Sequence, residues 1–375
     1  MKRKKTDIKI FTDNIESAAL TQIDTLIETG IFENSKIRIM PDVHQGEGCV
    51  IGLTAALKDK VIPNIVGVDI GCGVLVAEMS DIKIDFMMLD NFIRRNIPFG
   101  FSVNKSFGNP WEKSLAVNIR NMIYQQLYCL EYLNNPERLV YSCGSLGGGN
   151  HFIEIGVDQQ QNKYLMIHSG SRNLGYQVAA YYQQLAIKTC KKIVPEENLP
   201  DDLCYLVDEN KNRYLHDMLI CQQFAVLNRL IIKKRISEFL NIDIEKLKTF
   251  ASVHNYIGND NIIRKGAISA RKGEKLVIPI NMKDGCIIGL GKGAADWNYS
   301  APHGAGRILS RRQAKRLLDL RAFKEEMDGI YTTCISHDNL DEAPMAYKPI
   351  EEIMDRIHDS VAIETVIKPV YNFKA

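Results

Sequence analysis

Asp69 and Cys72 lie three residues apart in the stretch Val66 to Gly73, which reads Val-Gly-Val-Asp-Ile-Gly-Cys-Gly. Because glycine adopts backbone conformations that other residues avoid, this stretch reads as a turn that follows the apolar run Val61 to Val68. A carboxylate oxygen and a thiolate sulfur at this spacing suit a divalent transition metal such as Mn²⁺, Zn²⁺ or Fe²⁺. Taken alone, the same residues also fit a buried cysteine beside a turn-forming aspartate.

Four of the eight histidines share one sequence context, at an expected strand end or in a loop beside small residues. They are His151, His168, His254 and His303. A rigid scaffold presents functional groups at such positions, and imidazole is a common ligand for these metals. Together with Asp69 and Cys72, the four would supply two metal sites that share a bridging thiolate. His216 and His358 instead fall inside expected helices, which favours a structural role for both.

Short apolar runs broken by glycine predict the strands that would carry these residues. We expect a strand over 7–12, a strand-and-turn region over 36–76, a strand over 164–167, a strand pair near 275–290 and a short final strand. The metal-binding candidates therefore belong to a β-rich scaffold.

Apolar residues at helical spacing predict the helices between these strands. The expected helices run from Asp13 or Asn14 to Gly30 and over 85–95, 111–133, 211–240, 311–327 and 350–363. Ser310 and Gln313 form a capping box for the helix over 311–327. The chain has no internal repeat and no linker. It therefore predicts an α+β fold, a single compact domain over 1–375 with mixed or antiparallel sheets flanked by helices.

The composition, with 45% hydrophobic and 25% charged residues among 375, describes a globular protein with a substantial core. Nine cysteines without paired spacing favour free thiols. No segment reads as a secretory signal or a membrane span, so we expect a cytoplasmic protein without a membrane partner.

The net charge of +2 is nearly neutral, so a polyanionic partner would need a local basic surface. The candidate residues for such a surface are Lys58, Lys60, Arg264, Lys265, Arg271, Lys272, Arg311 and Arg312. The alternative interpretation is a merely solvated charged face.

Six short motifs follow one another along the chain and provide more evidence about function than the single residues do. They are Met40 to His44, Val66 to Gly73, Gly147 to Glu154, His168 to Arg172, His254 to Tyr256 and His303 to Arg307. Together they resemble the RtcB family of GTP-dependent RNA ligases, in particular a compact bacterial branch, from about residue 37 to the C-terminus. The resemblance implies an RtcB-like fold.

The resemblance also implies an activity and its cofactors. The protein would join an RNA 3′-phosphate or 2′,3′-cyclic phosphate to a 5′-hydroxyl, in RNA repair or tRNA splicing, using GTP and two Mn²⁺ ions per chain. His303 would be the nucleophile that forms a covalent histidine-GMP intermediate. Cys72 would bridge the two ions, with Asp69 and His151 completing one site and His168 and His254 the other. The implied nucleotide contacts are Asn150, Glu154, His254, Asn255, His303, Gly304, Ala305, Gly306, Arg307, Tyr347 and Lys374.

One stretch departs from the family pattern. Residues 279–285 read Pro-Ile-Asn-Met-Lys-Asp-Gly, where many members have a serine-containing Pro-Gly-Ser-Met-Gly stretch that helps to bind guanine. Two other functions fit the same residues, namely a two-metal phosphoesterase acting on RNA ends and an inactive RNA-end-binding protein. A nucleophilic histidine flanked by Gly304 and Gly306 favours the ligase. The expected partners are RNA ends and GTP, and the motifs identify no protein activator.

Overall fold

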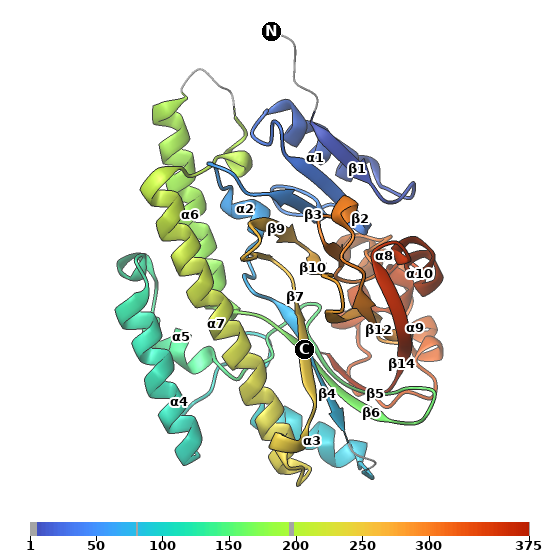
Figure 1. Cartoon of the computed structure of the whole chain (residues 1–375). Coiled ribbons are helices and arrows are strands. Elements are labelled where there is room, and N and C mark those ends of the chain that lie inside the picture. Colours follow the sequence, from blue (N-terminus) through green and yellow to red (C-terminus); the bar gives the residue numbers. More distant parts are fainter. Residues whose placement is uncertain (1–5, 80–81, 195–198, 375) are drawn as a thin grey trace.

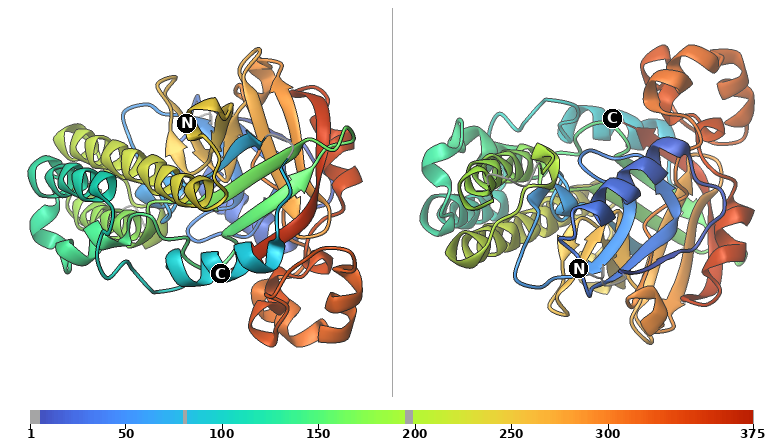
Figure 2. Two further views of the ribbon diagram at one scale, coloured as in Figure 1. Left: turned by 90° about the horizontal axis from the view of Figure 1, so that it is seen from below. Right: turned by 90° about the horizontal axis from the view of Figure 1, so that it is seen from above.

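The computed structural model describes residues 6–79, 82–194 and 199–374. Three β-sheets lie together in one half of the molecule, and a layer of long helices occupies the other half (Figure 1). Figure 2 shows this division from two further directions. The predicted α+β class with antiparallel sheets is confirmed. Within the described ranges, no helix combines the length and apolar composition needed to cross a lipid bilayer.

The largest sheet has seven strands, and every neighbouring pair in it is antiparallel. In spatial order these are β11 (Lys275–Asn281), β12 (Gly285–Gly291), β14 (Val361–Lys374), β5 (Phe152–Val157), β6 (Lys163–Ser169), β4 (Gly73–Met79) and β7 (Thr249–Val253). Side chains alternate between the faces of a strand. Accordingly, Leu75 and Ala77 pack in one apolar cluster and Val74 and Val76 in another. Both faces of the sheet centre are therefore covered, which fixes the register of its strands.

Two smaller sheets lie beside it. The five-stranded sheet has the order β1 (Asp7–Ile10), β2 (Lys36–His44), β3 (Ile51–Ala56), β9 (Ile262–Lys265) and β8 (Tyr256–Ile257), and only its β1 and β2 are parallel. In the two-stranded sheet, β10 (Ala267–Ser269) pairs with β13 (Ser300–Pro302). Since β9 continues almost directly into β10, the two smaller sheets are held close together.

The helical layer consists mainly of α4 (Pro110–Asn121), α5 (Pro136–Ser142), α6 (Arg172–Ile193) and α7 (Asp208–Phe239). The other helices are α1 (Ser17–Glu28), α2 (Pro63–Val66), α3 (Phe86–Asn96), α8 (Arg311–Leu317), α9 (Leu320–Glu326) and α10 (Ile350–Ile357). Tyr182 of α6 and Tyr214 and Phe224 of α7 lie in one apolar core with residues of β2 and β3. This core joins the helical layer to the sheets.

Several expected boundaries were wrong. The first helix begins at Ser17 and has no side-chain cap, whereas Asp13 or Asn14 was expected to cap it. The helix expected over 111–133 ends at Asn121 and is followed by one π-helical turn. The chain then leaves the helix because the carboxylate of Asp217 accepts hydrogen bonds from the backbone N–H groups of Tyr128 and Cys129, at 3.0 and 3.1 Å.

Other differences follow from local caps and from tertiary packing. The helix expected over 311–327 is two helices, because Asp319 caps the start of α9. The last helix ends at Ile357, and the final strand, expected to be short, is β14 with 14 residues. Pro63–Val66 is a short helix within the expected strand-and-turn region, and α6 was not predicted. All nine cysteines are free, as expected.

Candidate functional site

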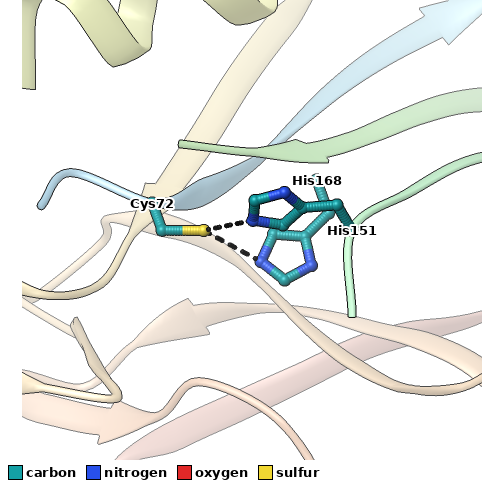
Figure 3. A group of neighbouring side chains, drawn as sticks. All are labelled: Cys72, His151 and His168. Carbon is teal, nitrogen blue, oxygen red and sulfur yellow. Dashed lines mark hydrogen bonds between the residues drawn. The ribbon is translucent and has the colours of Figure 1, made fainter. Parts of the chain in front are cut away.

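Cys72 meets His151 and His168 at one end of the central strands of the seven-stranded sheet (Figure 3). The register pairs Val74 of β4 and Phe152 of β5 with His168 of β6. Cys72 and His151, which come directly before β4 and β5, therefore lie beside His168. The thiol sulfur is 3.2 Å from Nε2 of His151 and 3.3 Å from Nε2 of His168. All three side chains are buried, and their donor atoms are close enough to hold one cation.

Asp69 and His254 extend this group in opposite directions. Oδ2 of Asp69 lies 3.1 Å from Nε2 of His151, and Nε2 of His254 lies 3.4 Å from Nε2 of His168. The backbone N–H of His254 donates to the carbonyl of Cys72 at 2.8 Å, which fixes the end of β7 beside the turn. The five side chains form a continuous row with Cys72 in the middle, and we call them the ligand cluster. The structure thus brings together all five residues expected to bind metal.

The protonation states within the ligand cluster suit metal binding. Nδ1 of His151 lies 3.0 Å from the carbonyl of Leu146, and Nδ1 of His168 lies 3.2 Å from that of Asn150. Since a carbonyl only accepts, Nδ1 of His168 carries the proton and its Nε2 offers a lone pair to the centre of the cluster, whereas Nδ1 of His151 also lies 3.1 Å from Nη1 of Arg172, which only donates. Burial lowers the pKa of His151, His168 and His254, which keeps their rings neutral.

Cys72 and Asp69 also bear on whether these donor atoms fit a metal ion. Burial and the charge of Asp69 raise the pKa of the Cys72 thiol well above its ordinary value, so a bound cation would have to displace its proton. Oδ1 of Asp69 is buried and has no hydrogen-bond partner among the described residues. An unsatisfied buried carboxylate oxygen beside sulfur and imidazole nitrogen fits a cation of the Mn²⁺, Fe²⁺ or Zn²⁺ type.

His303 lies against one end of the ligand cluster and comes from a different sheet. It follows β13, and its ring centroid is 4.7 Å from that of His254. Its Nδ1 is 2.7 Å from Oδ2 of Asp42, a fully buried residue of β2. Its Nε2 forms no hydrogen bond with any residue that the structure describes. The Asp42 carboxylate therefore holds one ring nitrogen and leaves the other available.

Backbone contacts make the pairing of Asp42 with His303 tight. The same Oδ2 atom accepts hydrogen bonds from the backbone N–H groups of His303 and Gly304, at 3.1 and 3.2 Å. Gly306 has φ +76°, and a Cβ there would lie 2.4 Å from the backbone oxygen of Asp42. Only glycine fits at this position, so the sequence pattern around His303 follows from its packing against β2.

A cavity of about 340 Å³ opens beside His303. Its lining contains most residues expected to contact a nucleotide, namely Asn150, Glu154, His303, Gly304, Ala305, Gly306, Arg307, Tyr347 and Lys374. Of the other two, His254 lies behind this wall in contact with the ring of His303. Asn255 lies outside the lining, with its carboxamide bonded to the backbone of Asp69 and Gly266. We call this space the nucleotide cavity, after the contacts that the family resemblance leads us to expect there.

The wall of the nucleotide cavity contains a buried carboxyl group with a shifted pKa. Burial raises the pKa of Glu154 to about 8. The side chain of Asn372 donates a hydrogen bond to Glu154 at 2.7 Å, while its own Oδ1 is buried without a partner among the described residues. Asn372 therefore presents an unused acceptor in the wall of the cavity.

A second buried carboxylate, Glu342, ties the basic residues of the cavity together. Its Oε2 is 2.8 Å from Nζ of Lys374 and 2.6 Å from the hydroxyl of Tyr347. Burial opposes its ionisation, but Lys374 and Arg311 outweigh burial and lower the pKa of Glu342 to about 2. Arg307 lies 3.5 Å from the same carboxylate, so its guanidinium is held by an ion pair within the protein.

Sequence reasoning gave no role to Asp42, Glu342 or Asn372. Asp42 lies inside the first motif, which was the one available signal, and nothing in the sequence distinguished the other two. The expected basic surface was wrong for two members. Arg264 is buried in a 2.7 Å ion pair with Asp260, and Lys265 is buried, donating to the carbonyl of Asn64 at 2.8 Å, because β9 lies inside the five-stranded sheet.

Comparison with known proteins agrees with this geometry. The model of the family described as tRNA-splicing ligase RtcB matches residues 25–375. The chain is 31% identical over 404 residues to the RNA-splicing ligase RtcB of Escherichia coli K12, which covers 97% of this chain and 96% of that protein. It is 28% identical over 412 residues to the tRNA-splicing ligase RtcB of Nanoarchaeum equitans, which covers 86% of this chain and 84% of that protein.

Proposed function

Because this chain belongs to the RtcB family of RNA ligases, we propose that it joins an RNA 3′-phosphate or 2′,3′-cyclic phosphate to a 5′-hydroxyl with GTP. The observation that supports this most directly is the Asp42–His303 pair, which lies between the nucleotide cavity and the ligand cluster. We further propose that the reaction serves RNA repair or tRNA splicing in the cytoplasm.

His303 is the nucleophile in this proposal. Its Nε2 lone pair attacks the α-phosphorus of GTP, a P–N bond forms and pyrophosphate leaves. The ring becomes positively charged as the bond forms, and the Asp42 carboxylate at Nδ1 stabilises that charge. The RNA 3′-phosphate then displaces His303 from phosphorus, and the 5′-hydroxyl finally displaces GMP to form the phosphodiester. His303 is regenerated by the second step.

The remaining wall of the nucleotide cavity would recognise guanine. Guanine offers N–H donors on one edge and a carbonyl acceptor beside them, so it matches a carboxylate next to an ammonium group. Glu154 and Lys374 provide this combination, and the free Oδ1 of Asn372 adds an acceptor. Residues of the stretch 279–285, which lacks the expected family serine, line the same cavity.

The ligand cluster would hold two Mn²⁺ ions. Asp69, Cys72 and His151 would bind one, and Cys72, His168 and His254 the other, since Cys72 lies between the two groups. When bound, such ions neutralise phosphate charge and polarise phosphoryl oxygens.

Covalent labelling tests the proposal. The protein is incubated with Mn²⁺ and α-labelled GTP, denatured and examined for retained label, comparing wild type with His303→Ala and His358→Ala. His358 is exposed and has no role in the proposed reaction, so its variant controls for the loss of a histidine. We expect label on wild type and His358→Ala only. The absence of label from wild type would reject the ligase, and GTP-independent hydrolysis of RNA ends would support the phosphoesterase instead.

A further inference from the structure

A second cavity, of about 560 Å³, lies at the other end of the ligand cluster. Asp69 and His151 belong to its wall, whereas His168 and His303 line the nucleotide cavity. The two cavities share no lining residue. The ligand cluster therefore lies between the two cavities and contributes side chains to the wall of each.

Two exposed aromatic rings belong to the lining of this second cavity. The side chain of Phe101 is 98% exposed and that of Tyr176 is 55% exposed. The turn that carries Phe101 is held in place, because Gly100 N–H donates to the Gly147 carbonyl at 2.8 Å and Arg138 donates to the Phe101 carbonyl at 2.7 Å. These hydrogen bonds fix the backbone that carries Phe101 at the rim of the cavity that Tyr176 also lines, so a planar group bound there can stack on both rings.

Near the ligand cluster, the wall of the second cavity contains the guanidinium of Arg172 beside the carboxylate of Asp69. Nη1 of Arg172 lies 3.1 Å from Nδ1 of His151, and Nε of Arg172 is buried without a partner among the described residues. The guanidinium occupies the space of a Cβ at Gly147, where a Cβ would lie 1.7 Å from Nη2. Arg172 itself has φ +56°, a backbone conformation that costs free energy in a residue with a side chain. The structure thus holds this charge beside the metal ligands at some cost.

We propose that this second cavity, which we call the aromatic cavity, binds the single-stranded end of the RNA that carries the 3′-phosphate. The terminal phosphate lies near Arg172 and the ligand cluster, and the last bases stack on Phe101 and Tyr176. Aromatic rings stack on any base, so this contact gives affinity without sequence preference. The inference rests on the proposed function and assigns the place of its RNA substrate.

The order of groups along the site supports this assignment. His303 contacts the His254 end of the ligand cluster, and the aromatic cavity adjoins the Asp69 end. A phosphate that enters from the Asp69 end approaches the guanylate from the side away from His303. Displacement of His303 from phosphorus requires that direction of approach, because attacking and leaving atoms lie roughly in line. A protein or lipid partner would not need to reach the ligand cluster, so this arrangement favours RNA as the occupant.

Binding and labelling measured on the same variants test the proposal. Phe101→Ala, Tyr176→Ala and the double variant are titrated with a fluorescent single-stranded RNA that ends in a 3′-phosphate. We expect the Kd to rise about fivefold or more for each ring removed, while labelling of His303 by GTP stays at the wild-type level. Tyr176→Phe should retain wild-type affinity because it keeps the ring. Tyr128→Ala is the matched control, since Tyr128 is 57% exposed and lines neither cavity.

Two results would overturn the proposal. One is an unchanged RNA affinity in the double variant, which would mean that the two rings do not contact this RNA. The other is loss of affinity only for an RNA offering a 5′-hydroxyl and no 3′-phosphate, which would assign the aromatic cavity to the opposite strand. Failure of the proposed function gives a different pattern, because wild type itself would then carry no label.

Discussion

The ligand cluster and the Asp42–His303 pair use the same side chain in two surroundings. Nδ1 of His168 faces a backbone carbonyl, and Nδ1 of His151 faces a carbonyl and the Arg172 guanidinium, surroundings that suit a neutral ring. In His303, Nδ1 faces a buried carboxylate, which would stabilise the positive charge formed when Nε2 attacks as proposed. In the proposed function, the group bonded to Nδ1 thus distinguishes the metal-binding histidines from the nucleophile.

The two regions also depend on different parts of the fold. Cys72 and His151, directly before β4 and β5, and His168, within β6, are aligned by the strand register of one sheet. The Asp42–His303 contact joins two sheets, since Asp42 is on β2 and His303 follows β13. Variants should therefore separate metal binding from nucleophilic attack.

Replacing Cys72 should have the largest effect, because its sulfur is the central atom of the ligand cluster. We expect Cys72→Ala to lose both Mn²⁺ ions, measured as bound metal per chain after gel filtration. Cys143→Ala, at a buried cysteine outside the cluster, should keep the wild-type metal content. A Cys72→Ala protein that still holds two tightly bound ions would contradict a bridging thiolate.

Asp42→Asn should separate the two regions most clearly. The substitution keeps the size of the side chain and removes the charge that stabilises the His303 imidazolium. We expect the rate of histidine labelling to fall about 100-fold or more, with unchanged Mn²⁺ content. If the rate stays within a factor of two of wild type, the carboxylate is not needed. Asp260→Asn, at a carboxylate paired with Arg264, serves as the control.

Glu154 gives the nucleotide cavity a pH dependence of its own. Its pKa of about 8 means that the carboxylate form, which would accept hydrogen bonds from guanine in the proposed function, accumulates as the pH rises from 7 to 9. We expect the KM for GTP in the labelling reaction to fall over this range, and Glu154→Gln to show no such fall. A wild-type KM that is constant from pH 7 to 9 would contradict the role of this ionisation.

The same group affects stability in the opposite direction. Burial favours the protonated form of Glu154, so its pKa in the folded chain is above the ordinary value of 4.5. The stabilisation is complete below pH 4.5 and is lost as the pH rises through about 8. Relative to Glu154→Gln, the wild-type Tm should therefore fall between pH 5 and 9. Thermal unfolding of both proteins across this range measures it, and parallel Tm profiles would count against the shift.

The smallest effect is expected at Asn372. Asn372→Ala removes one hydrogen bond to Glu154 and one unused acceptor, so the KM for GTP should rise about fivefold, with kcat unchanged. Asn281→Ala, at another asparagine of the same lining whose side chain bonds Asp284, provides a comparison. An equal rise in both variants would show that Asn372 has no special part in recognising the base.

The sequence predicted the ligand cluster better than the surroundings of His303. Aspartate, cysteine and histidine are residue types that bind metals. Because Asp69, Cys72 and the histidines were expected near strand ends, their types indicated a metal site. Asp42 and Asn372 act through contacts with His303 and Glu154, which lie 261 and 218 positions away, and Glu342 joins Arg311 and Lys374 from two other segments, so no local pattern encodes these roles.

The helices also differ in how well the sequence predicted them. Helix α7 has a long uninterrupted helical sequence and was predicted, whereas α6 begins at Arg172 directly after a Ser-Gly-Ser loop and was not. Neither helix has a side-chain cap at its start. The first two residues of α6, Arg172 and Asn173, line the aromatic cavity.

The position of the ligand cluster between the two cavities has a consequence for inhibition. If GTP and the RNA end bind as proposed, a small molecule that fills the nucleotide cavity would compete with GTP and leave the RNA site accessible, because no lining residue is common to both. A molecule in the aromatic cavity would show the reverse pattern. Linking two such molecules would require a connector that passes through the row of ligands or around it, so dual-site blockers of this enzyme should be built as metal chelators with an arm on each side.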